Sequence, residues 1–204
     1  MTPLLDIAWF VVVLGIGVGY FTLSALVHEL GHWIAGRLVG VACKLEWQRS
    51  GGLVVLTTRF VTSCSMTPPQ NVLVTSGGVV LQLLVNLVIL VDSGHPVLRG
   101  LAVIALPLIG VNVAPVEPTD GYHLLRMIGR LRGSTARMTV IFGFSQWSLF
   151  AAALMVTSWY SIVTLIGLWN VRDGATAGIG VLGVAMTVRV LRRVHVLSRY
   201  PSTS

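Results

Sequence analysis

Five long runs with almost no charge constrain this chain more than any other feature of its sequence. A helix needs about 20 residues to cross the roughly 30 Å hydrocarbon core of a bilayer. Runs of this kind occur at Ile7–Gly36, Gln70–Val91 and Gly100–Val116, within Met138–Val171, and, as the weakest of the five, from Gly174 to about Leu191. They predict an all-α integral membrane protein with about five transmembrane helices.

The composition supports a membrane protein over a soluble or a disordered one. Of the 204 residues, 54% are hydrophobic and only 10% are charged. A soluble domain typically carries about 25% charged residues, and a disordered chain has low hydrophobicity with high charge. We expect one polytopic domain over residues 1–204, with a core at 7–130 and C-terminal helices at 138–197. Cys43 and Cys64 lie in no disulfide or metal-binding pattern and receive no role.

The basic residues predict the orientation, because Lys and Arg accumulate in cytoplasmic loops. With the N-terminus outside, only Arg99 and Arg172 of the 14 basic residues stay outside. The net charge of +7 is then a topology signal in a cell-membrane protein with a cytoplasmic C-terminus, and not a sign of nucleic-acid binding. The cytoplasmic residues in this arrangement are Arg37, Lys44, Arg49, Arg59, Arg126, Arg130, Arg132, Arg137, Arg189, Arg192, Arg193 and Arg199.

The longest segment between spans, Val41–Pro69, contains β-branched residues on both sides of Ser50-Gly51-Gly52. This pattern predicts a short membrane-associated β-hairpin in which residues 44–47 pair with residues 53–56 and the chain turns at the two glycines.

The first span contains the pattern His-Glu-x-x-His at His28, Glu29 and His32. Histidines four residues apart lie on one face of a helix, so both imidazoles can reach one Zn²⁺, and the glutamate is placed to take a proton from bound water. Each charged group at the centre of a bilayer costs about 2.5–3.5 kcal/mol, so ionisable residues there indicate a function. The three residues predict a metal site inside the membrane.

A catalytic zinc site needs a third protein ligand. Counted from the outer ends of their spans, His28 and Asp120 both lie about 30 Å inward, near the cytoplasmic side. Zn²⁺ with the carboxylates of Asp120 and Glu29 also sums to zero charge, which favours burial. His123, one turn beyond Asp120, remains a competing ligand or a partner of a ligand. The other candidates are Glu46, His95, Glu117 and His195.

A second motif resembles a known family. Residues Asn112 to Gly121 read Asn-Val-Ala-Pro-Val-Glu-Pro-Thr-Asp-Gly. This stretch is similar to the Asn-x-x-Pro-x-x-Pro-x-Asp-Gly motif of site-2 proteases, the intramembrane zinc metalloproteases of peptidase family M50. In that family the motif follows a membrane-embedded His-Glu-x-x-His, and the same order occurs here. The resemblance covers about residues 7–130.

The resemblance implies a role for five residues. His28, His32 and Asp120 would bind Zn²⁺, Glu29 would be the catalytic acid and base, and Asn112 would help to hold the substrate backbone. An equal alternative for Asn112 is that its side chain satisfies backbone groups freed near a proline in the motif.

The chain also departs from the family pattern. Tyr122 stands where a second glycine is common, and Glu117 replaces a commonly apolar or proline position. Gly78 and Gln82 match only loosely the Gly-x-x-x-Asn of an intervening span.

The function implied is that of an intramembrane zinc metalloendopeptidase, active near the cytoplasmic side, whose substrates are single-span proteins of the bilayer. A transmembrane substrate has to unwind before cleavage, because its helix hides the carbonyl groups, and the hairpin edge can hold the extended segment by strand addition. The alternative is a non-proteolytic zinc-binding scaffold or metal-handling protein of the same fold. Glu29 favours the protease, because zinc binding alone does not need it. The sequence gives no oligomeric state.

Overall fold

The computed structural model describes residues 3–50, 53–60, 66–117, 119–130, 136–171 and 174–199. These residues form helices and one antiparallel hairpin. The elements are α1 (Pro3–Leu38), β1 (Cys43–Ser50), β2 (Leu53–Phe60), α2 (Pro68–Asp92), α3 (Pro96–Val113), α4 (Asp120–Arg130), α5 (Ala136–Val171) and α6 (Gly174–Arg199).

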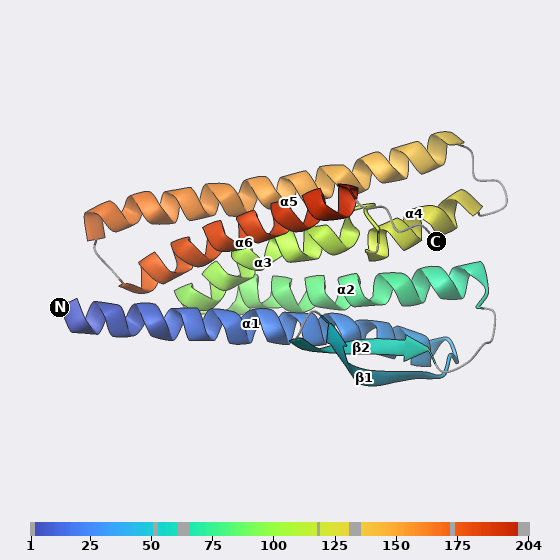
Figure 1. Ribbon diagram of the computed structural model, residues 1–204, viewed down its shortest axis with the longest axis horizontal. Helices are drawn as coiled ribbons and strands as arrows, with labels where there is room; N and C mark the ends of the chain where they lie inside the picture. Colours follow the sequence, from blue (N-terminus) through green and yellow to red (C-terminus); the bar gives the residue numbers. More distant parts are fainter. Residues whose placement is uncertain are drawn as a thin grey trace.

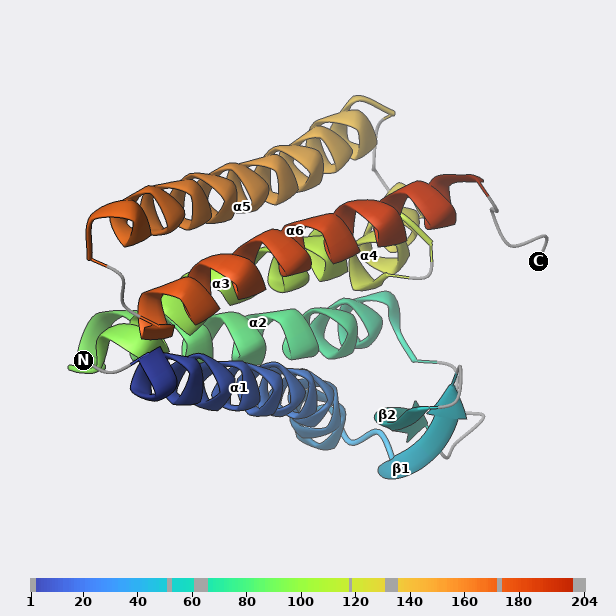
Figure 2. The same ribbon diagram turned by 60° about the vertical axis from the view of Figure 1, so that its left-hand side comes forward.

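The long helices lie side by side in a layered bundle (Figure 1). Helix α1 packs on α2 and α6, α3 lies between α2, α5 and α6, and α5 forms the outer layer on the side away from α1 (Figure 2). The start of α1, the end of α2 and the end of α5 share one end of the bundle. The hairpin, α4 and the end of α6 share the other end (Figure 1). Helix α3 is the most enclosed, and its Leu101 and Ile104 are completely buried.

Five helices, α1, α2, α3, α5 and α6, are long and apolar enough to cross a membrane. Their outer faces expose large apolar side chains; on α5, Phe144 is 72% exposed and Trp159 71% exposed. Soluble proteins rarely expose contiguous apolar surface on this scale. Together these features suggest a multi-pass membrane protein. The weakest predicted span is present as the stretch Ala175–Arg192 of α6, with a mean hydropathy of 1.4.

Two predicted boundaries need correction at the third helix. It begins at Pro96 and ends at Val113, whereas the uncharged run predicted Gly100–Val116. Proline is well suited to the first turn of a helix, so the helix starts before Arg99. At the other end, Ala114 precedes a proline and adopts an extended ψ of 139°, which stops the helix.

Helix α4 was not expected as a separate element. Its 11 residues are too few to span a bilayer, and its polar and apolar residues alternate with helical periodicity, so it has no long apolar run. It lies at the end of the bundle, packed against α2 and α5 (Figures 1 and 2).

The predicted hairpin is present, but its strands are longer than residues 44–47 and 53–56. Pairing runs from Cys43 opposite Phe60 to Ser50 opposite Leu53. Only residues 51 and 52 connect the strands, and such a short connection lets pairing begin at once on both sides. The two glycines themselves lie outside the described residues. The hairpin lies along the C-terminal half of α1 (Figure 1).

Candidate metal centre

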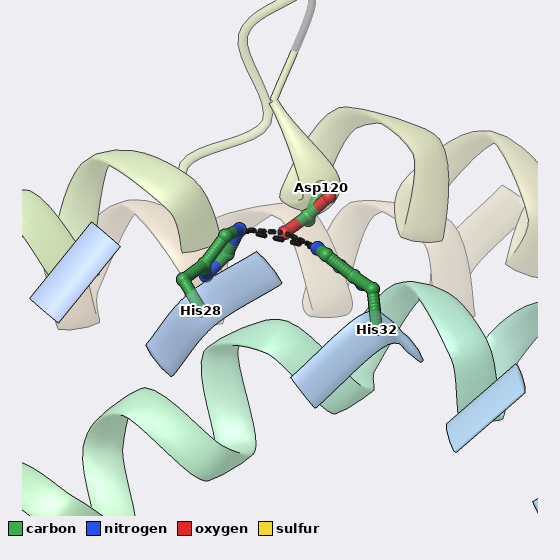
Figure 3. A group of neighbouring side chains, drawn as sticks. All are labelled: His28, His32 and Asp120. Atoms are coloured by element: carbon green, nitrogen blue, oxygen red, sulfur yellow. Dashed lines mark hydrogen bonds and ion pairs between the residues drawn. The ribbon is translucent and has the colours of Figure 1, made fainter. Parts of the chain in front are cut away.

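Three donor atoms from two distant parts of the chain meet beside the N-terminal half of α2. His28 and His32 lie one turn apart on α1, and Asp120 is the first residue of α4 (Figure 3). Oδ2 of Asp120 is 3.1 Å from Nε2 of His28 and 3.2 Å from Nε2 of His32. The two Nε2 atoms are 3.1 Å apart. The three atoms therefore form a nearly equilateral triangle.

This triangle fits a bound divalent metal ion. In a tetrahedral zinc site with bonds of 2.0–2.1 Å, neighbouring ligand atoms lie about 3.3 Å apart. Oδ2 of Asp120 is buried and has no hydrogen bond with suitable geometry within the described part of the chain, although both imidazoles are close. Lone pairs on two nitrogens and one oxygen repel one another unless a cation lies between them. These three residues are the group in the described chain that can hold a metal ion.

Helix α2 sets the orientation of the second histidine. Nδ1 of His32 lies 2.8 Å from the carbonyl oxygen of Val74, so Nδ1–H donates and Nε2 keeps its lone pair for a metal. The imidazole also lies against Gly78, where a Cβ atom would be 2.7 and 2.8 Å from ring carbons of His32. Only glycine leaves room for the ring at this position.

The same two helices touch through their backbones at the preceding residue of each helix, Gly31 and Gly77. A Cβ atom at Gly31 would collide with the carbonyl group of Gly77, and a Cβ atom at Gly77 would lie 2.7 Å from the carbonyl oxygen of Gly31. Small residues permit this kind of close approach between membrane helices. The glycine inside the His-Glu-x-x-His pattern therefore brings α1 against α2, and this contact fixes the distance from His32 to Val74.

A chain of polar side chains leads away from the first histidine. The Asn112 amide lies 3.4 Å from Nδ1 of His28 and 3.4 Å from Oε1 of Gln82, and Gln82 also bonds Ser24 at 2.9 Å. An amide can present either its oxygen or its nitrogen to a partner by turning over. With a metal on Nε2, Nδ1 of His28 carries a proton; Asn112 then presents its oxygen, and Gln82 must turn over as well, because the same Asn112 atom faces both partners. The chain links α1, α2 and α3 behind the site.

The turn before α4 fixes the position of Asp120. Thr119 is the N-cap residue: its hydroxyl accepts the N–H of Tyr122 at 3.3 Å and donates to the carbonyl oxygen of Ala114. These bonds tie the first turn of α4 to the end of α3. Asp120 thus stands at the N-terminus of a helix, where the helix dipole stabilises a carboxylate.

Two further contacts hold the first turn of α4. A Cβ atom at Gly121 would collide with the backbone of Val113 and Ala114, so only glycine lets α4 begin this close to α3. From the other side, Nε2 of the buried Gln146 on α5 donates to the carbonyl oxygen of Gly121 at 2.9 Å. The Asp-Gly pair therefore combines a candidate metal ligand, Asp120, with Gly121, the residue that allows α4 to pack closely against the end of α3.

Opposing effects act on the pKa of the Asp120 carboxyl. Burial alone raises this pKa, but the contacts with His28 and His32 outweigh burial and lower it from 3.8 to about 2. Because the folded pKa lies below the ordinary value, the carboxylate contacts favour the folded state above about pH 4. That contribution is lost as the pH falls toward 2. At neutral pH Asp120 is ionised and able to bind a cation.

Glu29 is held by the hairpin and is not one of the three converging residues. Its Oε2 accepts the backbone N–H of Thr58 at 2.7 Å, and the Thr58 hydroxyl donates to the Glu29 carbonyl oxygen at 2.8 Å. The Thr58 N–H therefore does not pair with β1, and the edge of β2 that carries this N–H faces α1. The carboxylate is also within electrostatic range of His32.

The structure places the remaining candidates outside the three-residue group. Glu46 and Glu117 are not part of it. His123 is exposed on α4. His95 caps the start of α3 at the opposite end of the bundle, and His195 is exposed near the end of α6.

Several contacting residues carried only weak signals in the sequence. Gly78 and Gln82 were indicated only by their loose match to the Gly-x-x-x-Asn of an intervening span. Nothing in the sequence indicated the Val74 carbonyl or Thr58. Asn112 contacts His28 and Gln82; among the described residues its side chain bonds none of the backbone groups near Pro115. Cys43 is buried, with its sulfur against the Trp33 carbonyl oxygen, and Cys64 lies outside the described residues.

Comparison of the chain with models of protein families, with curated proteins and with solved structures finds no match.

Proposed function

We propose that this protein is an intramembrane zinc metalloendopeptidase of the site-2 protease type. The observation that carries the proposal is the convergence of His28, His32 and Asp120 from two motifs 88 residues apart, with Glu29 next to the first ligand. The resemblance of both motifs to that family supports the same function. Two imidazoles and one carboxylate leave one tetrahedral position open, as in catalytic zinc sites.

Zn²⁺ bound by the three residues would lower the pKa of a bound water from 15.7 to about 7. The chain contributes orientation and proton transfer. Val74 and Asn112 hold the two imidazoles with their Nε2 atoms toward each other, and Asp120 supplies a negative charge. Glu29 takes a proton on its carboxylate and returns it to the leaving amine.

The hairpin offers a backbone edge beside this site. The edge of β2 that faces α1 lies next to Glu29, because the Thr58 N–H on this edge donates to the Glu29 carboxylate. An extended substrate segment that pairs with β2 by strand addition would run past Glu29, and its carbonyl oxygen would accept the Thr58 N–H in place of the Glu29 carboxylate. The same hydrogen bond therefore holds the carboxylate at rest and releases it when a substrate strand enters.

The basic residues at one end of the bundle support the orientation proposed for the chain. Arg99 lies at the opposite end, near the start of α3. Because Lys and Arg favour the cytoplasmic side, the site lies toward the cytoplasm of a cell membrane, with the N-terminus outside. His32 is six residues from the end of α1, about 9 Å from that surface. The exposed basic side chains at this end include Arg126, Arg130, Arg137, Arg189 and Arg192.

The test compares purified wild-type protein with Glu29→Gln on a panel of single-span membrane proteins, with zinc content measured in parallel. We expect Glu29→Gln to keep its zinc and to lose activity by about 10²–10⁴-fold, which is the usual contribution of a general base. Asp92→Asn is the matched control, because it makes the same carboxylate-to-amide change on an exposed residue at the far end of α2.

Two outcomes would contradict the proposal. Equal cleavage by wild type and Glu29→Gln would remove Glu29 from the reaction. Bound zinc without cleavage of any substrate in the panel would favour the non-proteolytic zinc-binding protein.

A further inference from the structure

A polar pocket lies between α2 and α4 at the basic end of the bundle, apart from the metal centre. Its volume is about 280 Å³. This is near the lower end of the range for small-molecule sites, roughly 300–1,000 Å³, and suits a small polar group. The lining residues are Asn71, Thr75, His123, Arg126, Met127 and Arg130.

The lining comes from one stripe on each helix. Asn71 and Thr75 are four residues apart on α2, and the four α4 residues follow the helical spacing i, i+3, i+4 and i+7. Residues at these spacings share one face of a helix. The two stripes therefore face each other, with hydroxyl and amide groups on one wall and basic groups on the other.

The charges of this pocket have no counterpart in the described part of the chain. Arg126 and Arg130 form no ion pair there, and none of the described lining residues is acidic. Guanidinium groups are suited to phosphate because their planar N–H donors match its oxygens. Asn71 and Thr75 add donors from the opposite wall.

The position of the pocket connects it with the metal centre through both walls. On α2, Thr75 follows Val74, whose carbonyl oxygen orients His32. On α4, Asp120 begins the helix that carries Arg126 and Arg130. A ligand that contacts both stripes would hold together the two helices that position these two metal ligands.

We propose that the pocket between α2 and α4 binds a phosphate ester and thereby holds α4 against α2 in the geometry that binds the metal. An anionic phospholipid headgroup and a soluble phosphate compound share this chemistry. Basic pockets between membrane helices at the cytoplasmic side are suited to anionic headgroups. The binding site does not depend on the proposed protease function; its effect on the metal rests on the metal centre.

The experiment uses the full chain in a detergent with a neutral headgroup and native mass spectrometry with short-chain phosphatidylglycerol or phosphatidylcholine. Wild type should retain one phosphatidylglycerol in preference to phosphatidylcholine. The double variant Arg126→Gln/Arg130→Gln should bind it roughly 30-fold more weakly, because each arginine near an anionic headgroup contributes about fivefold. Both arginines are exposed, so the fold should be unaffected, and circular dichroism checks this.

Arg189→Gln/Arg192→Gln is the matched control, because it removes the same charge from exposed positions at the same end of the bundle on α6. The control should bind within about twofold of wild type. An equal loss of phosphatidylglycerol affinity in the two double variants would overturn the proposed binding site, since the loss would then reflect overall charge alone. Retention of phosphatidylglycerol by the pocket variant at wild-type strength would overturn it as well.

A second arm separates the two sources of phosphate. Displacement of the lipid by millimolar inorganic phosphate at constant ionic strength would support a soluble phosphate as occupant, and resistance to displacement would support the lipid. A third arm measures zinc affinity against a competing chelator. The phosphate compound that binds in the second arm should raise zinc affinity several-fold in wild type and in the control variant, but not in the pocket variant Arg126→Gln/Arg130→Gln. An equal rise in all three proteins would refute the coupling, whether or not the protein cleaves any substrate.

Discussion

The contact between Gly78 and His32 gives the sharpest test of the metal centre. In Gly78→Ala the new methyl group would lie 2.7 and 2.8 Å from carbons of the imidazole and closer still to Nε2, the atom assigned to the metal. The helices cannot separate easily to relieve this contact, because α1 and α2 already touch through the backbones of Gly31 and Gly77. The ring must therefore turn away from Asp120.

The cost of forcing an extra methyl group into a packed site is about 1–3 kcal/mol. Without metal His32 can turn aside, so most of this cost falls on the metal-bound state. We expect Gly78→Ala to weaken zinc binding by roughly 5–150-fold, measured by competition with a chromogenic chelator in detergent. Gly19→Ala is the control, because no atom lies within 4 Å of its new methyl group. Zinc affinity of Gly78→Ala within twofold of wild type, with an unchanged circular dichroism spectrum, would refute the reasoning.

Three further predictions concern the surroundings of the ligands. Gln82→Leu removes the amide behind Asn112 and should weaken zinc binding about tenfold in the same chelator assay, since partners of ligands typically contribute 10–100-fold; unchanged affinity would contradict the proposed polar chain. Gln146→Leu removes the hydrogen bond to the Gly121 carbonyl oxygen and should lower the free energy of unfolding by about 0.5–1.5 kcal/mol; an unchanged unfolding temperature would contradict this. Zinc affinity should fall steadily as the pH is lowered from 7, because protons compete with the metal for the two imidazoles, while Asp120, with its pKa lowered to about 2, stays ionised; an affinity that does not change between pH 7 and pH 5 would contradict this order.

The helical part of the fold follows closely from the sequence, because hydrocarbon excludes charge and exposed backbone groups. Each of the five apolar runs corresponds to one helix of the structure, although the third helix ends three residues before its run does. The exact ends could not be predicted from hydropathy, since they depend on prolines, as at Pro96, and on helices that extend beyond the apolar run, as α6 does to Arg199. Helix α4 has no long apolar run, and its position results from contacts with α2, α3 and α5.

The candidate site divides in the same way. Helical spacing placed His28 and His32 on one face, and depth along the spans together with charge balance favoured Asp120, with His123 left as a competing ligand. The supporting contacts depend on which helices are neighbours, which periodicity does not give. Val74 takes part through a backbone carbonyl, so its side chain carries no signal, and Thr58 takes part through a backbone N–H.

The distance in sequence between His32 and Asp120 has a mechanical consequence. A metal ion bound to both residues closes a loop of 88 residues, much as a covalent cross-link would. If the chain is extracted from a bilayer by pulling on its two ends, the metal should prevent about 300 Å of contour length from extending until the coordination bonds break. The metal-free protein should release this length gradually, helix by helix, so the force trace itself would report whether the two motifs share one ion.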